Sequence, residues 1–228
     1  MKIAVVGSYG AGLTMKMSRW PALGETLSGG EFDNGPGGKG SNQAVGAARL
    51  GADVTLLTAV GADSFGRQAH ELWRAEGIDS RHVVDSESPT MVAVILVEPK
   101  GDNRIVIAPG ALDDLTLADV EAFRSVIAEA DLCLVSMEIP VEIAVEALRV
   151  AKEVGTRSVL NPAPASPLPD LAWGYIDVLT PNQTEGRILM GLEPDEALDH
   201  LDVLSALRER TAAQIVLTLG SEGALVDD

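Results

Sequence analysis

The chain has few basic residues: 17 lysines and arginines stand against 34 aspartates and glutamates, which gives a formal net charge of −17 at pH 7. A surface with such an excess of negative charge repels nucleic acids, anionic membranes and other large polyanions. We therefore expect no nucleic acid and no membrane as a partner. If the protein binds an anion, residues close to that anion must supply the attraction.

Cysteine and histidine are also scarce. The single cysteine, Cys133, lies in the apolar run DLCLVSM, so no disulfide forms within the chain and a buried, reduced, structural thiol is expected rather than a nucleophile. The three histidines, His70, His82 and His200, have no second ligand at metal spacing, which argues against a zinc site. The G-x-S-x-G pattern of many serine hydrolases is absent.

Neither a membrane-length apolar run nor the pattern of a signal peptide is found, so we expect a cytoplasmic protein. With 228 residues and 46% hydrophobic content, the chain is long enough for one substantial core. One main domain over residues 1–228 is expected.

Apolar runs that fit strands alternate with helical patterns. The expected strands are 2–7, 54–61, 131–137, 157–161, 176–182 and 215–220, and the expected helices are 41–50, 65–77, 117–130 and 141–155. Alternation of this kind predicts an α/β fold with a mostly parallel sheet and helices on both faces. The strands are continuous apolar runs, as expected for strands that are covered on both sides.

One region breaks the alternation. The runs TMVAVILVEP and NRIVIAPG flank KGD, which indicates a hairpin, and residues 25–35 are extended and glycine-rich. We expect a small antiparallel β element with strands inserted at about 24–36 and 88–109. The residues alone allow either an extension of the sheet edge or a lid over a cleft.

The stretch GPGGKGSNQA, residues 35–44, concentrates glycines before the helix expected at 41–50. It fails the P-loop pattern, because Lys39 is followed by Gly40 and Asp33 stands where the first glycine belongs. It matches G-x-G-x-x-G but does not follow an apolar strand, so an oxidoreductase with a nicotinamide cofactor has only this one match in its favour. A glycine loop that enters a helix favours an anion or sugar hydroxyls. Polar residues also follow the other strands, at the edge where parallel sheets bind ligands.

Four motifs in order, GGKGSNQA, NPAPA, TPNQTE and TLGSEG, resemble those of the ribokinase family of sugar kinases, also called PfkB carbohydrate kinases. The resemblance implies a ribokinase-like three-layer α/β/α fold with a small antiparallel β lid. It implies transfer of the γ-phosphoryl group of ATP to a sugar hydroxyl, with Mg²⁺ as a second cofactor. In many members of the family the lid also forms a dimer contact, so a homodimer through the lid is a further expectation.

The resemblance also assigns residues to the sugar site: Gly37, Gly38, Lys39, Gly40, Asn42 and Glu138. Taken alone, the glycine loop is equally consistent with a tight turn and a helix cap. Glu138, which follows the strand at 131–137, could instead cap the helix that starts near Val141.

For the nucleotide, the resemblance assigns Asn182, Thr218, Gly220, Ser221 and Gly223, and for the metal Glu185 and Asn182, acting through water. Without the resemblance, Asn182 and Glu185 fit a capping box at a helix start. The segment 218–223 then fits a strand that ends in a turn.

The sequence departs from the family in two places. The family's later glycine-rich signature, with its catalytic aspartate, is not present, so the expected base lies beyond Asp228. Without that base, the alternative function is a non-catalytic sugar- or nucleotide-binding module or a truncated pseudokinase. In the first loop, Gly10 and Gly12 replace the usual asparagine and aspartate. We therefore expect a bulkier or differently hydroxylated sugar than ribose, with the Tyr9 phenol as a candidate contact.

Overall fold

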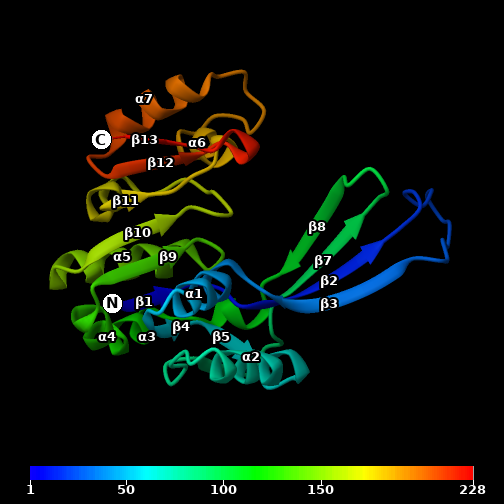
Figure 1. Ribbon diagram of the computed structural model, residues 1–228, viewed down its shortest axis with the longest axis horizontal. Coiled ribbons are helices and arrows are strands. Elements are labelled where there is room, and N and C mark those ends of the chain that lie inside the picture. Colours follow the sequence, from blue (N-terminus) through cyan, green and yellow to red (C-terminus); the bar gives the residue numbers. More distant parts are fainter. Residues whose placement is uncertain (228) are drawn as a thin grey trace.

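The computed structural model describes residues 1–227, and its main sheet has seven strands (Figure 1). Their order is β13 (Ala224–Val226), β12 (Gln214–Thr218), β11 (Val178–Leu179), β10 (Arg157–Asn161), β9 (Leu132–Ser136), β1 (Lys2–Val6) and β4 (Asp53–Leu57). All neighbouring pairs are parallel except β12 and β13, which are antiparallel. The expected mostly parallel sheet is confirmed.

Within residues 1–227, seven α-helices connect and cover these strands. They are α1 (Lys39–Arg49), α2 (Ser64–Ala75), α3 (Leu117–Ala122), α4 (Arg124–Glu129), α5 (Val141–Val154), α6 (Gln183–Leu189) and α7 (His200–Arg210). Short 3₁₀ turns cover Gly110–Asp114, Asp170–Tyr175 and Gly220–Glu222.

Alternate residues of β1 show that helices cover both faces of the sheet. Ile3 and Val5 pack in a core cluster with Trp73 of α2, whereas Ala4 and Val6 belong to a second cluster that contains residues of α3, α4 and α5. Because successive side chains of a strand point to opposite faces, the two clusters lie on opposite sides of the sheet. This is the three-layer α/β/α arrangement.

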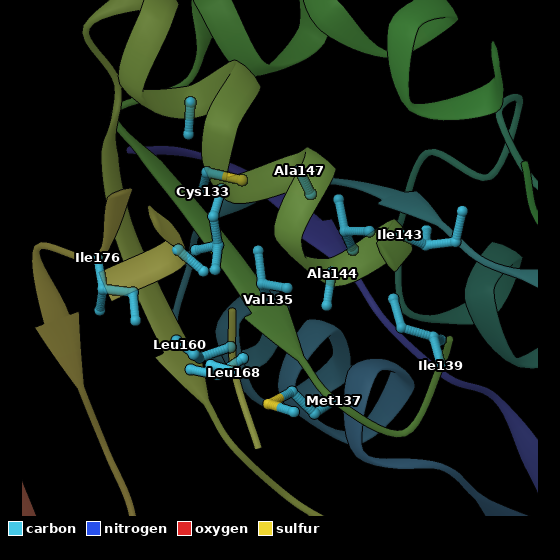
Figure 2. Packing of buried hydrophobic residues seen from close by; sticks show 14 of the residues in the cluster. Cys133, Val135, Met137, Ile139, Ile143, Ala144, Ala147, Leu160, Leu168 and Ile176 are labelled. Carbon is cyan, nitrogen blue, oxygen red and sulfur yellow. The ribbon is translucent and has the colours of Figure 1, made fainter. Parts of the chain in front are cut away.

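Cys133 lies in the second cluster, where β9 faces α5. Figure 2 shows Cys133 and Val135 on the same side of the strand as Ala144 and Ala147 of the helix. The thiol is fully buried, and this burial raises the pKa of Cys133 to about 12. A structural cysteine, rather than a nucleophile, is confirmed.

A second sheet projects from one side of the main sheet (Figure 1). It contains β3 (Glu31–Gly37), β2 (Gly10–Lys16), β7 (Val92–Val97) and β8 (Asn103–Ala108), in that order, and we call it the small sheet. β7 and β8 form the hairpin expected around Gly101, whose φ of 92° suits the turn. Because these strands pair only with one another, they do not extend the edge of the main sheet.

Strand β2 is not among the strands expected from the sequence, which places Gly10 and Gly12 in a loop after the first strand. It pairs antiparallel with β3 and parallel with β7, so the small sheet is mixed rather than purely antiparallel. Glycine disfavours strands in isolation, and Gly10 and Gly12 therefore conceal this strand in the sequence. Hydrogen bonds to neighbours on both sides outweigh that local preference.

Two other expected elements are divided in the structure. The strand expected at 54–61 becomes β4 and β5 (Ala59–Gly61), and β5 pairs with β6 (Val84–Ser86). The helix expected at 117–130 breaks at Phe123, which ends α3, begins α4 and is completely buried. Within residues 1–227, no helix combines the length and the apolar character needed to cross a membrane.

Candidate active site

The residues that follow the parallel strands meet at one edge of the main sheet, as expected. Ser8 comes after β1, Glu138 after β9 and Asn182 after β11, while Asn161 ends β10 and Gly220 follows β12. Since the strands are parallel, all five residues lie at their carboxyl ends. The four motifs singled out in the sequence therefore lie along a single edge.

The glycine loop packs closely against the backbone that follows β1. A Cβ atom on Gly38 would lie 2.6 Å from the Cα of Tyr9, and one on Gly40 would lie 2.6 Å from the carbonyl carbon of Gly7. Gly38 also has a φ of 86°, a conformation that side chains disfavour. Glycine is thus required at positions 38 and 40 for the chain to pack this closely against the backbone after β1. Gly38 directly precedes α1, and Gly40 lies in its first turn.

Glu138 lies beneath this loop and is held by two residues. Its carboxylate accepts hydrogen bonds from the Ser8 hydroxyl at 2.6 Å, from the Lys39 backbone N–H at 2.9 Å and from Lys39 Nζ at 2.7 Å. The alternative, in which Glu138 caps the helix near Val141, is wrong: α5 follows Pro140 without a side-chain cap. Glu138 instead accepts the Lys39 backbone N–H at the N-terminus of α1, although 99 residues separate the two in the sequence.

The first backbone N–H groups of α1 are consequently occupied within the protein. The Lys39 N–H donates to Glu138, the Gly40 N–H to the Ser8 hydroxyl at 3.4 Å, and the Ser41 N–H to the Ser8 carbonyl at 2.8 Å. The sequence predicts that these N–H groups are available to an anion or to sugar hydroxyls, whereas in the structure the protein itself supplies their acceptors. In this structure the anion at the helix N-terminus is a carboxylate of the chain itself.

The charge state of Glu138 follows from these contacts. Burial acts to raise the pKa of its carboxyl group, but the hydrogen bonds from Lys39 and Ser8 outweigh burial and hold the pKa below its usual value. The Glu138 side chain is 9% exposed and that of Lys39 is 39% exposed. Glu138 is therefore ionised at neutral pH, and Lys39 is the more exposed member of the pair.

Asn182 and Glu185 form a capping box at the start of α6. Asn182 Oδ1 accepts from the Glu185 N–H at 2.8 Å, and Glu185 Oε2 accepts from the Asn182 N–H at 2.8 Å. The helix-capping interpretation is thus realised. It uses only one oxygen of the Glu185 carboxylate, so the second oxygen lies outside the motif.

The positive charge of Lys39 also acts on the carboxyl group of Glu185. Burial raises the pKa of Glu185, while the Asn182 N–H and the positive charge of Lys39 act to lower it. Lys39 thus contacts Glu138 directly, and its charge also favours the ionised form of Glu185. A cation near Glu185 would relieve the cost of burying its charge.

The described part of the chain contains no cluster of three or more histidine, cysteine, aspartate or glutamate side chains that could hold a metal. Magnesium, however, usually binds proteins through one or two carboxylates and several waters. The free oxygen of Glu185 fits that mode of binding, with Asn182 beside it.

The TLGSEG segment forms the turn between β12 and β13. Gly220 and Gly223 have φ values of 60° and 97°, and the Leu219 N–H donates to the Gly223 carbonyl at 2.8 Å. The Thr218 N–H donates to the Pro181 carbonyl at 2.9 Å, which joins this turn to the capping box. Thr218 and Ser221 are exposed, as are both glycines and Asn42 in the first turn of α1.

Sequence reasoning missed two groups of residues at this edge. Ser8, which bridges Glu138 and Gly40, carries no local sequence signal. Asp63 accepts from the Gly66 N–H at 2.9 Å, as the cap of α2, and from the Thr90 N–H and hydroxyl, both at 2.8 Å. An aspartate before a helix is a capping signal that could have identified Asp63, but its link to the small sheet could not be foreseen.

The proposed sugar contact from Tyr9 is wrong. Tyr9 is 1% exposed and packs edge-on against Trp73, with ring centroids 5.3 Å apart. Burial, followed by the charge of Asp63, raises the pKa of the Tyr9 phenol to about 12. Tyr9 is a core residue without surface for a sugar.

Comparisons with known proteins support the resemblance seen in the motifs. The model of the pfkB family of carbohydrate kinases matches residues 2–228. The ribokinase of Haemophilus influenzae is 36% identical over 225 residues, which cover 98% of this chain and 74% of the relative. A deoxyribokinase of Salmonella typhimurium is 34% identical over 228 residues, which cover 99% of this chain and 74% of the relative.

The fold agrees with these relatives. The structure of Arabidopsis thaliana ribokinase complexed with ribose and ATP superposes with a TM-score of 0.85 at 27% identity, covering 99% of this chain and 74% of that one. Ordered motifs, sheet topology and the family match thus lead to the same assignment. The chain belongs to the pfkB family of carbohydrate kinases.

Proposed function

We propose that the protein is an ATP-dependent sugar kinase, which transfers the γ-phosphoryl group of ATP to a sugar hydroxyl. The observation that carries this proposal is that the residues assigned to the sugar and those assigned to the nucleotide lie at the same edge of the main sheet, where Lys39 Nζ donates to Glu138 and the Thr218 N–H donates to the Pro181 carbonyl. The first contact joins residues assigned to the sugar, and the second joins the two motifs assigned to the nucleotide.

On the sugar side, we assign Gly37, Gly38, Lys39, Gly40, Asn42 and Glu138. Gly38 and Gly40 let the loop pack against the backbone that follows β1, and the exposed Asn42 side chain can donate and accept hydrogen bonds with hydroxyls. Glu138 fixes the loop and the lysine rather than standing free. Sugar selectivity then depends on other residues of the cleft.

On the nucleotide side, we assign Asn182, Thr218, Gly220, Ser221 and Gly223. The segment 218–223 offers backbone N–H groups and the exposed hydroxyl-bearing side chains of Thr218 and Ser221 to phosphate oxygens. Glu185 and Asn182 would hold Mg²⁺ through water, and the ion would neutralise phosphate charge during transfer. The complex of Arabidopsis ribokinase with ribose and ATP supports these two classes of ligand.

No residue of this chain is assigned as the catalytic base. We further propose that the small sheet acts as a lid and as the contact of a homodimer. Its exposed apolar residues Phe32, Ile105 and Val106, which are 60%, 52% and 72% exposed, support a second copy as the partner. A cytoplasmic location, where ATP is available, accompanies this proposal.

The test is ATP consumption by the longest natural polypeptide that contains these residues, with and without Mg²⁺ and a panel of sugars. The proposal predicts turnover that requires both the metal and a sugar, and that is lost in a Glu138→Gln variant that still folds. The matched control Glu129→Gln removes a carboxylate of an exposed ion pair with Lys2 and should leave turnover unchanged. Sugar binding without turnover would instead support the non-catalytic module.

A further inference from the structure

Gly10 and Met91 are coupled by close contact at the base of the small sheet. A Cβ atom on Gly10 would lie 2.2 Å from Met91 Cε and 3.0 Å from the Met91 carbonyl oxygen. Met91 is 2% exposed, immediately before β7. The methionine methyl group thus occupies the space that any larger residue at position 10 would need.

The same methionine lines a cavity of about 350 Å³ next to Glu138. Most of its lining is apolar, with Met91, Ile107, Leu112, Met137 and Ile139 among the contributors. Figure 2 shows Met137 and Ile139 just beyond the end of β9, on either side of the position of Glu138 in the sequence. The polar lining consists of carboxylates, Glu138 and Asp113, and Glu138 is already engaged by Lys39 and Ser8.

The register of the small sheet extends this apolar surface. Gly12 lies opposite Gly35 on β3 and Ala93 on β7, and Ala93 lies opposite Ile107 on β8. Residues opposite one another share a face of the sheet. Because Ile107 lines the cavity, the face turned toward it carries no polar side chain in this row.

We propose that Gly10 and Met91 set the substrate class of this site, and that the preferred substrate is a deoxy sugar. This inference rests on the proposed function. A hydroxyl turned toward Met91 and the row of Gly12 would lose its bonds to water without gaining a partner, whereas a deoxygenated carbon would pack against the thioether. Met91 acts through the small part of its surface that lines the cavity and by excluding a larger side chain at position 10.

The experiment compares D-ribose with its 2-deoxy and 3-deoxy counterparts. Calorimetry on the chain gives affinities, and sugar-dependent ADP formation by the longest natural polypeptide gives kcat/KM. We expect at least one deoxy sugar to be preferred over ribose by about tenfold or more, because an apolar pocket disfavours an added hydroxyl by up to about 100-fold. Equal or better use of ribose would overturn the inference while leaving the sugar kinase intact.

Variants test the role of the pair. Met91→Ala should reduce the preference for the deoxy sugar, and Gly10→Asn combined with Met91→Gly should move it toward ribose by about tenfold. Gly46→Asn is the matched control, since open space surrounds an added Cβ at that exposed helix position. Melting curves identify variants that fold. An unchanged preference in folded Met91→Ala would contradict the inference, and failure of all sugars to bind or react would contradict the proposed function as well.

Discussion

Glu138 Oε1 and Lys39 Nζ lie 2.7 Å apart, although 99 residues separate them in the sequence. The same carboxylate accepts the Lys39 backbone N–H, so one glutamate holds both the side chain of the lysine and the start of α1. The glycine loop is thereby tied to the residues that follow β9, an interior strand of the main sheet. The predictions below test what this connection contributes.

Replacing Glu138 with glutamine should destabilise the fold by about 1–3 kcal/mol, because the change weakens three hydrogen bonds to a charged acceptor that is 9% exposed. Urea unfolding measures this difference. Glu129→Gln, at a pair whose side chains are 56% and 73% exposed, should cost about 1 kcal/mol or less. Equal effects of the two variants would show that Glu138 has no special role.

The contribution of Glu138 should depend on pH in one direction. The pKa of its carboxyl group in the folded protein lies below the value of 4.5 for the unconstrained group, so the unfolded chain binds the proton more tightly. The stabilisation is therefore complete above pH 4.5 and is lost as the pH falls through the lower folded pKa. Unfolding free energies of the wild type and Glu138→Gln should converge below pH 4.5. A gap that stays constant from pH 7 downward would contradict this account.

Gly40→Ala should destabilise the loop by about 1–3 kcal/mol, because the added Cβ would lie 2.6 Å from backbone atoms of Gly7 and Ser8 that cannot move independently. Gly46→Ala, on the same helix, adds the same atom to open space and should stabilise by roughly 0.5–1 kcal/mol. Thermal melts of the two variants give the comparison. If both stabilise, the loop is not packed as described.

The two roles of Glu185 can be separated by a conservative substitution. Glutamine also serves in a capping box, so Glu185→Gln should keep the start of α6 and change stability by less than about 1 kcal/mol. It removes the charge that we assign to the magnesium site, so affinity for Mg²⁺ and ATP together should fall by about tenfold or more. Calorimetry with and without Mg²⁺ provides the readout. Unchanged binding would leave Glu185 with the capping role alone.

The sequence predicted most of the main sheet, because β1, β4, β9, β10 and β12 are short apolar runs that are buried on at least one face. The capping alternative for Asn182 and Glu185 was also predictable, since its hydrogen bonds join residues three apart. Such local interactions depend on the residues within one turn. The motifs therefore gave the fold and the edge of the sheet where the candidate site lies.

Long-range contacts were not predictable. Strand β2 has a glycine-rich sequence that favours a loop, and only pairing with β3 and β7 makes it a strand. Nothing near Glu138 indicates that it caps α1, and nothing near Tyr9 indicates that Trp73 buries it. The contact between Gly10 and Met91 joins strand β2 to the residue that immediately precedes β7. A single sequence contains no local signal for any of these pairs.

The most direct test of the central claim is the sugar-dependent formation of ADP from ATP by the longest natural polypeptide that contains residues 1–228. The account predicts that ADP forms only with Mg²⁺ and a sugar, and that one phosphorylated sugar appears for each ADP. ADP formation that is independent of sugar, or no phosphorylated sugar from any member of the panel, would contradict it.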